Sequence, residues 1–144
     1  MSSDTKAMWR NMEASYADSP IHRVLGLSLT VKGAGEVEVV YTGAPEAANR
    51  RGNAAGGALA EMIDSAVVQA CKTLIGPQDK VATLELKVNY VRPGPPNAPL
   101  ITHAKIDFLG RSTSVGVGRI VDESGELIAL GIVTVNVRRE KTAG

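Results

Sequence analysis

The sequence contains few of the residues that mark several large classes of protein. Its 144 residues include a single cysteine, Cys71, so an internal disulfide is excluded and a reducing compartment is favoured. Only 3% of the residues are aromatic, and the core must therefore be built from Val, Leu, Ile and Ala. The beginning of the chain has no uninterrupted apolar run, so neither a signal peptide nor a membrane span is predicted. We therefore expect a cytoplasmic protein.

An excess of charge of either sign is also missing. The chain has 16 basic and 15 acidic residues, well mixed along its length, for a formal net charge of +1. Without a basic stripe, a nucleic-acid partner is not expected. The two histidines, His22 and His103, stand apart with no second ligand at metal spacing, so no metal site is predicted. A nucleophile-elbow serine motif, a dinucleotide fingerprint and a phosphate-binding loop are absent as well, and no cofactor is expected.

Glycine and proline punctuation divides the sequence into one short helix, one long helix and six strands. The helices are predicted over 4–17 and 56–74, and the strands over 25–32, 36–42, 81–91, 100–109, 114–122 and 127–137. The first two strands form a hairpin around Gly33-Ala34-Gly35. This set of elements indicates an α+β fold in which an antiparallel sheet of about six strands wraps around the long central helix. A single helix covers only part of such a sheet, so we expect edge pairing with a second subunit.

The long helix has one apolar face and a carboxylate at the edge of that face. Its apolar residues recur at helical spacing: Leu59, Met62, Ile63, Ala66, Val67, Ala70 and Leu74. At roughly 100° per residue, Asp64 lies about 115° from the centre of this stripe, whereas Glu61 lies roughly opposite to it. Asp64 is therefore placed to border a buried cleft. Glu61 and Val68 point to an outer face that we expect to meet another surface.

The residues just before this helix are rich in glycine and polar side chains. The run from Asn49 leads directly into the helix, and Gly56 and Gly57 stand at its start. Free backbone N–H groups at a helix start polarise a carbonyl oxygen, and Asp64 follows about two turns later. This layout predicts acyl-transfer chemistry. Taken singly, the same residues have simpler explanations, since paired glycines permit close packing and Asn53 is a candidate helix cap.

These motifs resemble the hotdog-fold acyl-CoA thioesterases of the PaaI-like group. The resemblance rests on Asn49-x-x-Gly52-x-x-Ala55-Gly56-Gly57 followed by Asp64, and on the run Thr83-Leu84-Glu85-Leu86-Lys87-Val88-Asn89-Tyr90-Val91-Arg92-Pro93. It extends to Gly110-Arg111-Ser112 and to residues 122–129. It implies a hotdog thioesterase domain over 20–138, an N-terminal helix over 1–19 and a tail over 139–144. It also implies an acyl-CoA substrate, no metal or organic cofactor, and a homodimer at minimum, with a homotetramer expected.

The resemblance further implies a division of labour within the site. Gly57 would offer its backbone N–H to the thioester carbonyl, and Asp64 of the partner subunit would attack that carbonyl or activate a water molecule. Asn49 would bind the attacking water or the reacting carboxylate, and Thr83 would orient Asp64 or that water. On their own, Thr83 is equally typical of a strand and Asn49 of a turn. Further residues of the motifs would contact substrate: Ala55, Gly56, Arg111 and Ser112.

One position departs from the pattern of that group. Where its members usually have His-Gly-Gly at the helix start, this chain has Ala55-Gly56-Gly57. The amide site is kept, so we expect an active thioesterase that hydrolyses a small or medium acyl-CoA, or an aryl-CoA. The alternative is a non-catalytic acyl-CoA-binding protein that lost activity with the histidine. Four arginines would either receive the CoA phosphates or simply face solvent: Arg50, Arg51, Arg92 and Arg111.

Overall fold

The computed structural model describes residues 1–95 and 97–141, and its elements follow the predicted order. They are α1 (Ser3–Asp18), α2 (Pro20–Leu25), β1 (Leu27–Gly33), β2 (Glu36–Tyr41), the 3-10 turn η1 (Pro45–Ala47), α3 (Gly56–Lys72), β3 (Lys80–Tyr90), β4 (Leu100–Leu109), β5 (Thr113–Asp122) and β6 (Leu127–Arg138). Every predicted helix and strand is present, with its ends within two residues of the prediction. Two short elements, α2 and η1, were not predicted.

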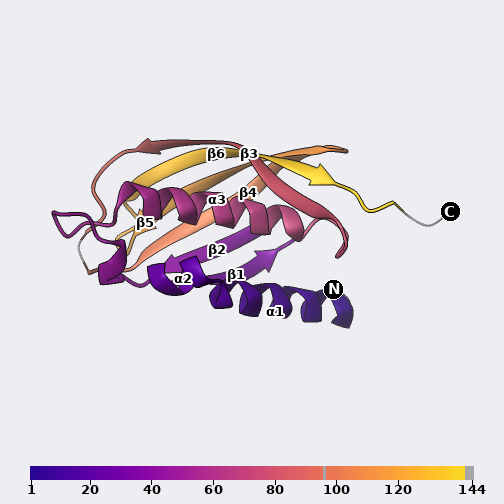
Figure 1. Cartoon of the computed structure of the whole chain (residues 1–144), viewed down its shortest axis with the longest axis horizontal. Helices are drawn as coiled ribbons and strands as arrows, with labels where there is room; N and C mark the ends of the chain where they lie inside the picture. Colours follow the sequence, from indigo (N-terminus) through magenta and orange to yellow (C-terminus); the bar gives the residue numbers. More distant parts are fainter. Residues whose placement is uncertain (96, 142–144) are drawn as a thin grey trace.

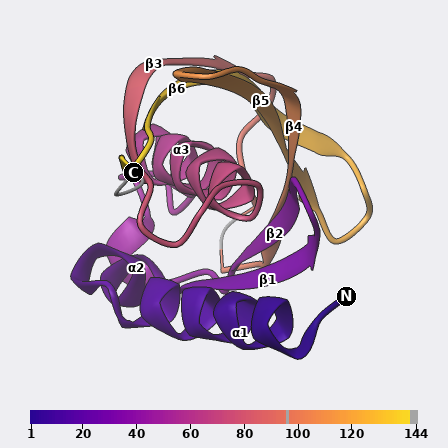
Figure 2. The same cartoon turned by 90° about the vertical axis from the view of Figure 1, so that its right-hand side faces the viewer.

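All six strands form one antiparallel sheet in the order β1-β2-β4-β5-β6-β3. Figure 1 shows this sheet lying across α3, and the end view in Figure 2 shows it curling around the helix. The arrangement confirms the expected α+β architecture, with a long central helix and a short N-terminal helix. Within the described chain β3 pairs only with β6, so one long edge of the sheet is formed by β3.

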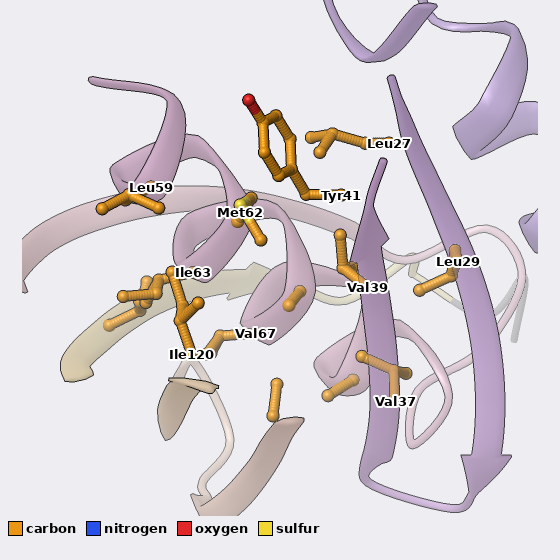
Figure 3. Close-up of a cluster of buried hydrophobic side chains, with 14 of the residues drawn as sticks. Leu27, Leu29, Val37, Val39, Tyr41, Leu59, Met62, Ile63, Val67 and Ile120 are labelled. Carbon is orange, nitrogen blue, oxygen red and sulfur yellow. The ribbon is translucent and has the colours of Figure 1, made fainter. Parts of the chain in front are cut away.

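The core lies between the sheet and the apolar face of α3, as the helical spacing predicts. Ile63 and Val67 are completely buried there, in the cluster of apolar side chains drawn in Figure 3. Three glycines of β5 and β6 bring the helix close to the sheet. A Cβ at Gly116 would lie 2.7 Å from Val67 Cγ1, and one at Gly118 or Gly131 would lie 3.1 Å from Ile63 Cγ2. This close approach lets aliphatic side chains fill the core with few aromatic rings.

The chain between α1 and β1 forms a second helix where a turn and the beginning of a strand were predicted. The prediction ended the first helix at Asp18-Ser19-Pro20 and began the strand at Leu25. Instead Ser19 is the N-cap of α2 and Pro20 occupies its first turn, where the missing N–H of proline costs no helical hydrogen bond. The helix ends at Gly26, whose φ of 68° is left-handed and favours glycine. The first helix still ends here, at Asp18, within one residue of its predicted end, and the proline also starts a second helix.

The two N-terminal helices lie on the side of α3 that faces away from the sheet (Figure 2), where α1 packs on β1 and single side chains reach α3. The hydroxyl oxygens of Tyr16 and Ser65 lie 2.7 Å apart, and His22 Nε2 lies 2.9 Å from Glu61 Oε1. Burial of the Tyr16 phenol raises its pKa. The expectation that the outer face of the long helix meets another surface is thus confirmed. That surface is the N-terminal segment of the same chain.

The C-terminal segment continues beyond β6 and is fastened to the turn before β3. Arg139 Nη1 lies 3.2 Å from Asp79 Oδ2, and the N–H of Glu140 donates to Asp79 Oδ1 at 2.8 Å. The N–H groups of Glu140 and Gly76, together with Arg139, lower the pKa of the Asp79 carboxyl. Of the tail predicted over 139–144, residues 142–144 lie outside the described residues. Across the described ranges, no helix is long and apolar enough to cross a membrane.

Candidate active site

The first turn of α3 is left without a capping side chain. Its N-cap is Ala55, not Asn53, and Ala55 contributes only its carbonyl oxygen, which accepts the N–H groups of Ala58 and Leu59. Within the described chain, neither the Gly56 N–H nor the Gly57 N–H has an acceptor, and both glycines are exposed. The positive end of the helix dipole adds to the potential at this point. The helix start is therefore able to stabilise negative charge on an oxygen atom.

The loop before the helix is organised by Asn49. Its side-chain oxygen accepts the N–H groups of Arg51 at 2.9 Å and Asn53 at 3.2 Å, and its own N–H donates to the Asn53 carbonyl at 2.7 Å. These bonds fold the chain back so that Ala48 and Ala54 form a short bridge. The side-chain oxygen of Asn49 is thus engaged within the loop. The predicted role of Asn49 toward water or the reacting carboxylate stays a prediction.

An open hollow of about 610 Å³ lies over this end of the helix. Its walls come from the loop over 49–54, from Gly56 and Leu59 of α3, and from the segment over 90–94. The Tyr90 hydroxyl on one wall donates to the Gly56 carbonyl at 2.8 Å. Three arginines and no acidic residue line the hollow: Arg50, Arg51 and Arg92. Arg92 Nη1 lies 3.2 Å from Glu126 Oε2, so the positive character of the hollow comes mainly from Arg50 and Arg51.

Asp64 lies farther along α3, half-buried at the edge of the apolar face as its angle predicts. The Thr83 hydroxyl donates to its Oδ1 at 2.7 Å. Thr83 stands where the pairing of β3 with β6 shifts register, just before Glu85. The structure thus joins these two predicted site residues, while their catalytic roles stay predictions.

A single chain does not bring Asp64 to the free amide of Gly57. Seven residues of one helix separate them, which corresponds to about 10 Å along the helix axis. A carbonyl carbon and its oxygen need both groups within roughly 3 Å. Asp64 is also absent from the walls of the hollow. Within one chain, the Asp64 carboxylate and the Gly57 N–H are therefore too far apart to act on the same carbonyl group.

Arg111 and Ser112 lie at the other end of the sheet from the hollow. Ser112 accepts the N–H of Val137 at 2.8 Å, near the end of β6, whereas Tyr90 pairs with Ala129 near its beginning. The two residues therefore share no surface with the hollow in the same chain. Their predicted contact with substrate stays a prediction.

Sequence reasoning missed two groups of polar contacts around α3. One is the Tyr90 hydroxyl on the Gly56 carbonyl, and the other is His22, whose Nδ1 lies 2.9 Å from the Tyr16 carbonyl oxygen and whose Nε2 faces Glu61. The sequence offers one signal for the contacts of His22, namely the outward position of Glu61 on the helix. In the part of the chain that is described, no three His, Cys, Asp or Glu side chains gather at metal-binding distance.

The comparisons with known proteins define the class of this molecule. The family model of the Thioesterase superfamily matches residues 51–129, more than half of the chain. The matched segment contains the end of the loop from Arg51, together with α3, β3, β4 and β5. It thus includes Gly57, Asp64 and Thr83, whereas Asn49 lies two residues before it. The chain belongs to the Thioesterase superfamily, and it is a thioester hydrolase. A search of curated proteins gave no match.

Solved structures resemble the chain over nearly its whole length. A thioesterase of Haemophilus influenzae is 18% identical, with 94% of each chain covered and a TM-score of 0.83. The PaaI protein of E. coli, from the phenylacetic acid degradation operon, is 22% identical, with 96% of this chain and 97% of that one covered and a TM-score of 0.82. A conserved protein of Pseudomonas aeruginosa is 28% identical, with 85% of this chain and 97% of that one covered and a TM-score of 0.78. The expected hotdog fold of the PaaI-like group is confirmed.

Proposed function

We propose that this thioester hydrolase acts on a small or medium acyl-CoA, or an aryl-CoA, at a site made by two copies of the chain. The observation that carries the proposal is the free N–H of Gly57 at an uncapped helix start, about 10 Å from Asp64 of the same helix. One chain cannot apply both groups to one carbonyl. Two chains related by a two-fold axis supply Gly57 from one helix and Asp64 from the other.

In the proposed reaction the Gly57 N–H binds the thioester oxygen and stabilises the negative charge that develops on it. Asp64 of the partner subunit either attacks the carbonyl carbon, which forms a mixed anhydride that water then hydrolyses, or removes a proton from an attacking water. In both routes the carbon–sulfur bond breaks and CoA leaves as a thiolate that takes up a proton. Thr83 holds Asp64 through its 2.7 Å hydrogen bond, and Asn49 assists the water.

The edge of the sheet supports the two-chain arrangement. β3 is an outer strand, and Leu84 in its middle is 63% exposed. Antiparallel pairing of β3 with its copy covers this edge and sets the two α3 helices side by side. Exposed apolar residues on the outer face of the sheet, Phe108 and Ile132, suit a second contact between dimers. The proposed assembly is a homodimer at minimum and a homotetramer in full.

Substrate binding is proposed to use backbone, small residues and arginine. Ala55 and Gly56 leave room for the thioester at the helix start. Arg50 and Arg51 make the hollow positive and suit the CoA phosphates. Arg111 and Ser112 lie far from the hollow of their own chain, so they contact substrate held mainly by the partner. We place the enzyme in the cytoplasm, in keeping with the free thiol of Cys71.

A second candidate function is acyl-CoA binding without hydrolysis. Ala55 favours it, because this side chain offers no hydrogen bond at the position where the PaaI-like group usually has histidine. The candidate explains the open helix start, but it gives no reason for a half-buried carboxylate held by Thr83.

Release of free thiol from a panel of short, medium, long and aryl acyl-CoAs tests the proposal. Asp64→Asn should lower kcat by about 10²-fold or more, because the amide neither attacks nor accepts a proton at neutral pH. Asp107→Asn, which neutralises an exposed carboxylate on β4, is the matched control and should keep full turnover. Binding of acyl-CoA without turnover, with hydrolysis gained in Ala55→His, would establish the second candidate instead.

A further inference from the structure

Tyr90, the last residue of β3, lies against the first peptide group of α3. Its hydroxyl donates a hydrogen bond to the Gly56 carbonyl oxygen at 2.8 Å. A Cβ at position 56 would lie 3.4 Å from Cζ and from the hydroxyl oxygen of Tyr90, so the ring packs directly on the backbone of Gly56. By contrast, a Cβ at Gly57 would meet nothing within 4 Å. One face of the helix start is therefore held by Tyr90 and the other is open.

The carbonyl that accepts this hydrogen bond belongs to the same peptide group as the Gly57 N–H. The Gly56 oxygen and the Gly57 nitrogen are the two ends of one planar, delocalised unit. A donor on the oxygen draws electron density away from the nitrogen and strengthens the N–H as a donor, by about 10–30% for each bond in a chain of hydrogen bonds. The same bond fixes the plane of the peptide, and so the direction in which the Gly57 N–H points.

We infer that Tyr90 is a positioning residue of the thioesterase, which holds and polarises the Gly56–Gly57 peptide group through its hydroxyl. The inference rests on the proposed function, in which the Gly57 N–H binds the thioester oxygen. Tyr90 itself does not touch the reacting carbonyl. It acts through a single peptide group, and its contribution is largest when charge develops on the thioester oxygen in the transition state.

Because Tyr90 is exposed, a role in catalysis can be distinguished experimentally from a role in folding. The side chain is 55% exposed at the rim of the hollow, so after loss of the hydroxyl the Gly56 carbonyl is free to bind water. Tyr90→Phe keeps the ring that packs on Gly56 and should unfold at the same temperature as the unmodified protein. Tyr90→Phe therefore removes the hydrogen bond to the Gly56 carbonyl while leaving the helix start folded.

Steady-state hydrolysis of the best acyl-CoA tests the inference, with Tyr41→Phe as the matched control. Tyr41 also donates its hydroxyl to a backbone carbonyl, that of Ala44, but it is not among the walls of the hollow. Tyr90→Phe should lower kcat about 3- to 10-fold and leave KM within about twofold, the pattern of a contact that strengthens in the transition state. Tyr41→Phe should keep kcat. An unchanged kcat in Tyr90→Phe, or an equal fall in Tyr41→Phe, overturns the inference.

The infrared frequency of a thioester carbonyl labelled with ¹³C gives a second readout. In the Asp64→Asn background hydrolysis should be slow enough for the bound substrate to be observed, and the Gly57 N–H should lower the stretching frequency of its carbonyl. Adding Tyr90→Phe should reverse part of that shift. If turnover depends on Asp64 while neither kcat nor the frequency responds to Tyr90, only the role of Tyr90 is overturned. If the unmodified protein neither hydrolyses nor binds any acyl-CoA, the proposed function and the inference fail together.

Discussion

The C-terminal end of α3 is closed, and the Thr73 side chain caps its backbone. Thr73, the C-cap, is only 9% exposed, and its N–H donates to the Gln69 carbonyl at 3.2 Å. Its hydroxyl donates to the Ala70 carbonyl at 2.7 Å and accepts the N–H of Gly35, at the β1–β2 turn, also at 2.7 Å. One side chain thus caps the Ala70 carbonyl and ties the end of the helix to the sheet.

The N-terminal end of the same helix is open. The Ala55 side chain offers no capping atom, and the N–H groups of Gly56 and Gly57, two exposed residues, have no acceptor in the described chain. A capping side chain here would contribute about 1 kcal/mol to stability. From this difference we expect the closed end to contribute more to stability, whereas the open end keeps two N–H donors available for a ligand.

The largest expected effect comes from removing the donor at the open end. Gly57→Pro deletes the N–H while remaining compatible with the first turn of a helix, so kcat should fall about 10²- to 10³-fold. Gly57→Ala keeps the N–H, and its methyl group enters open space, so it should stay active. Thiol-release kinetics on both variants, with circular dichroism to verify folding, measure the effect. Equal activity of the two variants would show that the Gly57 N–H is not used.

The next effect belongs to the closed end. Thr73→Val leaves the N–H of Gly35 without its buried acceptor, and should lower the free energy of unfolding by about 1–3 kcal/mol in urea titrations. Because the substrate site lies at the other end of α3, kcat should stay unchanged. Thr42→Val, which removes an exposed hydroxyl, should stay within about 0.5 kcal/mol of the unmodified protein. A loss of kcat without a loss of stability in Thr73→Val would contradict the contrast between the ends.

The smallest effect comes from closing the open end. A serine at position 55 has an oxygen in reach of the N–H at position 57, the second residue of the helix. Ala55→Ser should raise the free energy of unfolding by about 1 kcal/mol and lower kcat/KM about fivefold, because the cap competes with the substrate for the same donor. Urea titration and initial rates on one preparation check both changes. A rise in stability together with a rise in kcat/KM would count against an amide site.

Most of the fold follows from the sequence because glycine and proline mark the ends of its elements and its apolar residues recur at clear helix and strand spacing. The apolar stripe of α3 and the strand boundaries are local features, and the structure has them in the predicted places. The exception, α2, arose because Pro20 is compatible with both the end of one helix and the first turn of the next. Both hold in the structure, where α1 ends at Asp18 and α2 begins at Pro20. The contact of His22 in α2 with Glu61 in α3 joins distant parts of the chain, so local patterns do not reveal it.

The site was predictable where one helix or a known pattern defined it. The angle of Asp64 and the position of Gly57 come from α3 alone. The contact of Tyr90 with Gly56 joins residues 34 positions apart and depends on the end of β3 reaching the helix start, which periodicity does not reveal. The pairing of Asp64 with an amide of a second chain is likewise outside the reach of local patterns, and it stays a prediction.

The central claim, that one site takes its carboxylate and its amide from different chains, is tested most directly by mixing two inactive variants. Asp64→Asn and Gly57→Pro are unfolded together, refolded and assayed for thiol release. In mixed dimers one of the two sites regains both an intact Asp64 and an intact Gly57, so the mixture should recover about a quarter of the unmodified activity. If the mixture stays as inactive as each variant alone, although mixed dimers have formed, the two-chain site is wrong.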